Sequence, residues 1–89
     1  MAKWRKLLDG MRGSPAGDWT ISNLETLARR VRIESRWNDG SHCTFSHRCT
    51  ETILTVPARR PIKPVYVRKF VELVDLVLNA QPLDDDGDD

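Results

Sequence analysis

One histidine of this chain stands in a sequence context that suits proton transfer. His42 follows Asp39-Gly40-Ser41, and this turn-like stretch separates two runs in which apolar and polar residues alternate. Asp-Gly between such runs is a strong signal for a β-hairpin, because glycine readily takes the positive φ that a tight turn requires. We therefore expect His42 at the first position of the returning strand, held by the sheet but close to its rim.

Basic residues flank this hairpin on both sides of the sequence. A titratable imidazole among fixed cations suits acid–base chemistry on a phosphodiester. RNA carries its own nucleophile, the ribose 2′-OH, so this chemistry needs no metal, and histidine has an ordinary pKa of roughly 6.5, which lets it take or return a proton. We predict His42 as the catalytic residue, and the expected phosphate contacts are Arg36, Arg48, Arg59, Arg60 and Lys63, with the backbone amides of Gly40 and Ser41.

A metal site built from His42, Cys43, His47 and Cys49 is the alternative use of the same segment. The spacing lacks the paired ligands that are typical of zinc sites, and adjacent residues of a strand point to opposite faces, so we expect no metal. His47 has the same parity as the apolar side chains of its strand, which favours a structural role. Two cysteines are too few for a secreted disulfide framework, so free thiols are expected.

The composition indicates one small domain with an anionic partner. The chain has 89 residues, of which 39% are apolar, and no apolar run long enough to span a bilayer, so we expect a cytoplasmic protein without a cofactor. The net charge is +1, but five of the 13 acidic residues lie in the last six positions. Residues 1–83 therefore carry 14 Lys and Arg against 8 acids, a net charge of +6 that favours nucleic acid as the partner.

The spacing of apolar residues predicts three helices. Residues 1–12 contain a short amphipathic helix, and a Gly/Ser/Pro-rich linker follows at residues 13–19. The second helix begins after Thr20, the expected N-cap. Because Asn23 stands three residues later, in place of Glu or Gln, we expect no capping box. A broad apolar stripe over residues 67–78 predicts the third helix, which could also cover the N-terminal helix or receive a partner, and residues 81–89 form an acidic tail that we expect to be disordered.

Between the second and third helices the apolar period changes to two, which predicts three strands. The first should be half-buried, with Ile33, Ser35 and Trp37 on its inner face. The second covers residues 42–46, with Cys43 and Phe45 inward, so that His42 lies on the open face. Residues 52–56 form the third strand. The predicted fold is α+β, an α-β-β-β-α arrangement over residues 20–80 like that of double-stranded-RNA-binding domains, with an extra N-terminal helix.

Several of these motifs together resemble the HicA family of bacterial toxins. They are Gly40-Ser41-His42, the aromatic Phe45, His47 at the end of the second strand, and Leu54-Thr55-Val56-Pro57, and the resemblance covers roughly residues 19–79. The chain departs from the family pattern at two places. Asp39 stands where members often have Lys or Arg, and Ala58-Arg59-Arg60 stands where many have a second histidine.

The resemblance implies a fold, an activity and a partner. HicA proteins have a double-stranded-RNA-binding-like fold and are ribosome-independent mRNA interferases of toxin–antitoxin systems, silenced by a HicB-type antitoxin. The histidine of their Gly-Ser-His motif is catalytic, and it matches His42. This implies a metal-independent endoribonuclease whose partners are mRNA and an antitoxin, with which it forms a hetero-oligomer. The alternatives are a non-catalytic module that binds RNA or protein on the same fold, and a structural subunit of a larger complex.

Overall fold

The computed structural model describes residues 3–82, which form three helices and one three-stranded sheet. The order and bounds are α1 (Lys3–Gly13), α2 (Ile21–Arg30), β1 (Glu34–Trp37), β2 (His42–Ser46), β3 (Ile53–Pro57) and α3 (Pro64–Ala80). This order confirms the predicted helices and strands. The acidic residues that end the chain lie outside the described residues.

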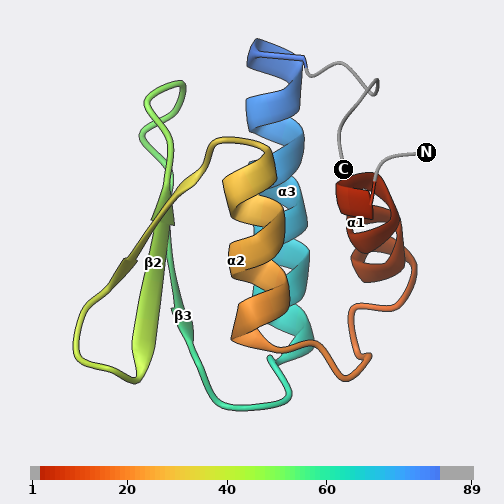
Figure 1. The fold of residues 1–89 in the computed structure, drawn as a ribbon, viewed down its shortest axis with the longest axis vertical. Coiled ribbons are helices and arrows are strands. Elements are labelled where there is room, and N and C mark those ends of the chain that lie inside the picture. The colour runs from red at the N-terminus through yellow and green to blue at the C-terminus, as the bar shows by residue number, and fades with distance from the viewer. Residues whose placement is uncertain (1–2, 83–89) are drawn as a thin grey trace.

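The molecule has three layers, which Figure 1 shows side by side. The sheet is one outer layer, α2 and α3 pack on one of its faces, and α1 lies on the far side of these two helices. One continuous apolar core joins the layers, with Phe45 of β2 against Phe70 of α3 at a ring-centroid distance of 4.9 Å. No helix of residues 3–82 covers the other face of the sheet, as predicted.

The antiparallel sheet has the strand order β1-β2-β3. Cys43 and Phe45 of β2 are buried, whereas the side chains between and beside them are only half-buried and face the open side. His42 pairs with Pro57 of β3, and Thr44 lies between Arg36 of β1 and Thr55 of β3. This register places His42 at one end of the sheet on its open face.

The burial of the first strand differs from the prediction. Of the three residues expected on its inner face, only Ile33 is buried. Ile33 enters the core just before β1, but all four residues of the strand are exposed, including Ser35. The physical reason is that β1 is an edge strand, which has a neighbouring strand on one side only. The Trp37 side chain remains 42% exposed, and its Nε1 donates to Glu25 Oε2 on α2 at 2.9 Å. The prediction of a half-buried strand was therefore wrong.

The start of α2 also differs from the prediction, because a capping box is present. Thr20 Oγ1 accepts a hydrogen bond from the Asn23 backbone N–H at 3.2 Å, and Asn23 Oδ1 accepts one from the Thr20 backbone N–H at 2.9 Å. The amide oxygen of asparagine here takes the role that Glu or Gln usually has. Thr20 is the N-cap, as expected.

The broad apolar surface of α3 is used on two sides. Phe70 and Val74 face the core beneath the sheet, while Leu73 and Val77 are also buried, and α1 packs against both α2 and α3. Trp4, Leu8 and Met11 supply the buried face of α1. The additional apolar positions of α3 are thus mostly covered, although Leu76 stays 46% exposed.

Candidate functional site

The candidate site lies at the end of the sheet where the β1–β2 turn meets the segment after β3. Gly40 has φ +86°, as the turn requires, and no atom lies within 4 Å of the position that a Cβ would take there. The Ala58 backbone N–H donates to the Ser41 carbonyl at 2.8 Å, which joins the turn to the residues that follow β3. In Figure 1 both segments and the start of α3 gather at the lower end of the molecule.

His42 is held at this end by its own turn. Its side chain is 44% exposed, and its Nδ1 lies 3.4 Å from Asp39 Oδ1 and 3.2 Å from Ser41 Oγ. Ser41 Oγ in turn donates to Asp39 Oδ1 at 2.9 Å. An adjacent carboxylate favours the tautomer with the proton on Nδ1, which leaves the Nε2 lone pair to accept a proton.

Asp39 organises the turn through a single oxygen. Its Oδ1 accepts hydrogen bonds from the backbone N–H of Ser41 at 3.0 Å and of His42 at 3.2 Å, besides the Ser41 hydroxyl. These bonds, above all those from Ser41, lower the pKa of Asp39 to about 2. The residue is therefore a carboxylate at any physiological pH, and it lies where it can orient the histidine ring.

A shallow hollow of about 450 Å³ begins at His42. It is lined by the turn residues 40 and 41, by His42, and by Pro57, Ala58 and Arg59. Arg59 is the cation that shares this hollow with the imidazole, and it is exposed. A guanidinium beside an exposed imidazole can stabilise the charge that develops on a phosphate while the ring transfers a proton.

The other predicted phosphate contacts are distributed unevenly around His42. Arg36 faces the open side diagonally across from His42, a relation that puts two residues roughly 7–8 Å apart, within reach of a long side chain. Lys63 precedes α3 and lines a second hollow together with Arg59. Arg60 pairs with Asp18 instead, with its Nη2 at 3.0 Å from Asp18 Oδ2. Of the two backbone amides, that of Ser41 already donates to Asp39.

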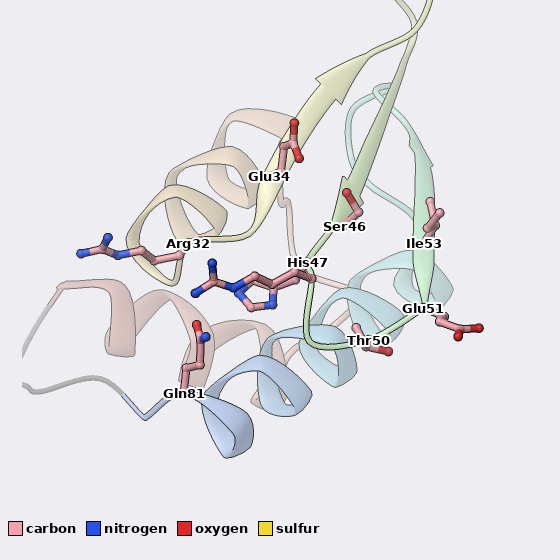
Figure 2. A pocket seen from close by; sticks show the side chains of 9 residues that line it. Arg32, Glu34, Ser46, His47, Thr50, Glu51, Ile53 and Gln81 are labelled. Carbon is pink, nitrogen blue, oxygen red and sulfur yellow. The ribbon is translucent and has the colours of Figure 1, made fainter.

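Arg48 is not brought to His42. It follows β2 at the opposite end of the sheet, and Ser46, where the strand ends, is roughly 13 Å from His42 on the basis of four steps of about 3.3 Å. There it lines another hollow, of about 600 Å³. Figure 2 shows this hollow, with His47 at its centre, Arg32 from the end of α2 and Gln81 from the end of α3.

The residues of this larger hollow hold the local structure together. Its two arginines are balanced by Glu34 and Glu51. His47 is only 9% exposed, and its Nδ1 accepts the Cys49 backbone N–H at 3.0 Å, so the ring holds the loop after β2. The prediction of a structural His47 is confirmed, and the smaller hollow at His42 is the better candidate site despite its size.

The cysteines have different surroundings. Cys43 is fully buried and Cys49 is exposed, and both are free thiols. Burial, followed by the nearby Glu25 charge, raises the pKa of Cys43. Within residues 3–82, no three His, Cys, Asp or Glu side chains come together in a way that could hold a metal ion.

Two site residues were missed from the sequence. Asp39 was noted only as a departure from the HicA pattern, and its contact with the His42 ring depends on turn geometry that the sequence does not specify. Tyr66 lines the second hollow with Lys63 and Arg59, and the only available signal was its place in the first turn of α3, after a proline-rich basic loop.

Comparison of the chain with protein-family models, with curated proteins and with solved structures finds no match in any of the three. Among the described residues, no helix is both long enough and apolar enough to cross a lipid bilayer.

Proposed function

We propose that this chain is the toxin of a type II toxin–antitoxin system, a metal-independent endoribonuclease that cleaves mRNA in the cytoplasm and is neutralised by a HicB-type antitoxin. The proposal includes a double-stranded-RNA-binding-like fold for residues 20–80, on which α1 is an addition. One observation carries it: His42 stands half-exposed at the sheet end, oriented by Asp39 and sharing a hollow with Arg59.

The geometry supports a specific division of labour. With its Nδ1 side turned to Asp39 and Ser41, His42 has Nε2 free to take the proton of a ribose 2′-OH. The resulting 2′-oxygen attacks the adjacent phosphorus, and the bond to the 5′-oxygen breaks. The departing 5′-oxygen takes a proton from solvent water, and the protonated His42 returns its proton to solvent. The products are a 2′,3′-cyclic phosphate and a 5′-OH end. Arg59 offsets the charge on the phosphate oxygens, and Arg36 and Lys63 hold the flanking phosphates.

The decisive experiment compares wild type with His42→Ala in cells and in vitro. Inducible expression of the wild type should stop growth and degrade transcripts, and the purified protein should cleave RNA in EDTA to leave cyclic phosphate ends. His42→Ala should lose about 10²–10⁴ in cleavage rate, the range for one well-placed proton-transfer group. Ser46→Ala is the matched control, since it lies on the same face of β2 at the far end.

Three results would contradict the proposal in different ways. Cleavage by His42→Ala at the wild-type rate would show that His42 is not catalytic. Products with 5′-phosphate ends, or cleavage that depends on Mg²⁺, would point to a different mechanism. RNA binding without cleavage by either protein would favour the non-catalytic binding module.

A further inference from the structure

A second, smaller hollow adjoins the one at His42. It measures about 150 Å³ and is lined by Pro57, Pro61, Arg59, Lys63 and Tyr66. Pro57 and Arg59 belong to both hollows, so the surface runs continuously from the imidazole to the first turn of α3.

Its walls combine flat apolar surfaces with cations. Tyr66 is half-buried and packs against the core, which fixes its ring, and two prolines supply rigid apolar walls. Arg59 and Lys63 are exposed beside them, and neither forms an ion pair with an acidic residue within positions 3–82. An aromatic face between uncompensated cations is the combination with which proteins hold single-stranded nucleic acid.

Residues 57–63, which carry most of these walls, are held in place by two backbone hydrogen bonds and one buried side chain. The Ala58 N–H donates to Ser41 as described above, the Ile62 N–H donates to the Trp19 carbonyl at 2.8 Å, and Ile62 itself is buried. A subsite with this support is preorganised, so binding a ligand costs little ordering of the loop.

We propose that this hollow is a nucleobase subsite, and that the RNA bound at His42 is single-stranded. The inference rests on the proposed nuclease function and names its substrate class. One unpaired base stacks on Tyr66 between the prolines, and Arg59, shared by both hollows, holds the phosphate that links this base to the reacting one.

The small size of the site argues against a duplex. Double-stranded RNA is recognised by contacts spread over about 16 base pairs, across two minor grooves and the phosphates between them. Here Arg59, Lys63 and the ring of Tyr66 line two adjoining hollows at one end of the molecule, and a base can enter a recess only when it is unstacked and unpaired.

The test is the affinity of the full-length protein for labelled RNA hexamers in which 2′-fluoro groups replace the 2′-OH, so that no cleavage occurs. Tyr66→Ala and Tyr66→Leu should weaken binding of the single strand about tenfold, within the range for loss of one base-stacking ring. Tyr66→Phe should bind within twofold of wild type. Leucine keeps apolar volume against the core, and Val65→Ala, exposed on the same helical turn, is the control. Thermal midpoints check that each variant is folded.

The outcomes separate this inference from the nuclease proposal. A wild-type protein that binds the hexamer through Tyr66 but never cleaves unmodified RNA would retain the subsite and overturn the nuclease. Cleavage that is unchanged in Tyr66→Leu, with the same KM, would retain the nuclease and overturn the subsite. Equal affinity for a duplex of the same length, or no binding of the hexamer by wild type, would also overturn it.

Discussion

Leu8 provides a quantitative test of whether α1 is an integral layer of the domain. Its side chain is 2% exposed and belongs to the core that α1 shares with α2 and α3. Leu→Ala at buried sites costs about 2–5 kcal/mol. We expect about 3 kcal/mol here, because α1 is covered on one side only and can settle partly into the space that is left.

This loss is large relative to the total free energy of unfolding. A domain of this size has a free energy of unfolding of about 4–12 kcal/mol, at roughly 0.05–0.15 kcal/mol per residue. One kcal/mol corresponds to about 4–8 °C in Tm for a domain of 60–100 residues, so Leu8→Ala should lower Tm by roughly 12–24 °C.

The matched control is Leu7→Ala, the same chemical change at the neighbouring position of the helix. Leu7 is only partly buried, so we expect about 1 kcal/mol and roughly 4–8 °C. Urea denaturation followed by far-UV circular dichroism measures both variants, and an unchanged m-value ensures that the comparison concerns stability. Equal losses in the two variants, or a loss below 1 kcal/mol for Leu8→Ala, would refute the packing of α1 on the other helices.

Three further predictions concern the turn and the thiols. Gly40→Ala should cost about 1 kcal/mol in urea denaturation, since the added Cβ meets open space but φ is +86°, whereas Gly13→Ala, with no positive φ, should be neutral or stabilising; equal effects would contradict this account. Cys49 should react with iodoacetamide in the folded protein, and Cys43 only after unfolding, as peptide mass spectrometry can measure; rapid labelling of Cys43 would show that the sheet opens. Asp39 should titrate with a pKa of about 2 by NMR, because hydrogen bonds from the following turn stabilise its carboxylate. The contribution of this carboxylate to the stability of the fold is then present above the ordinary pKa of 3.8 and is lost as the pH falls toward 2. A titration midpoint near 3.8 would mean that those bonds are absent in solution.

The spacing of apolar residues was sufficient to predict the helices and strands, because the buried residues form a single apolar core. The alternation around Cys43 and Phe45 and the helical stripe that contains Phe70 each match a buried face. Trp37 shows where this reasoning ends. Its parity indicates the inner face correctly, but whether a helix covers that face depends on the position of α2 relative to an edge strand, which the pattern of one strand does not contain.

The candidate site was predictable at its centre and less so around it. The turn and the exposure of His42 follow from local sequence, because a hairpin brings its own ends together. The partition of the cations is tertiary: Arg59 shares the hollow of His42, Arg60 turns to Asp18, and Arg48 lies at the other end of the sheet. Arg48 lies apart from Arg59 because β3 runs between them from one end of the sheet to the other.

Trp19 has a consequence for any shortened version of the protein. Its ring lies against α1, where a Cβ on Gly10 would come within 2.9 Å of it, its Nε1 donates to the Ser14 carbonyl at 2.8 Å, and its own carbonyl accepts the Ile62 N–H. A fragment that starts at residue 20 would retain every residue assigned to catalysis or RNA contact. It would nevertheless lose the Trp19 carbonyl that holds the basic loop at Ile62, together with the α1 surface on which the Trp19 ring packs. A shortened protein that keeps the basic loop in place must therefore include α1.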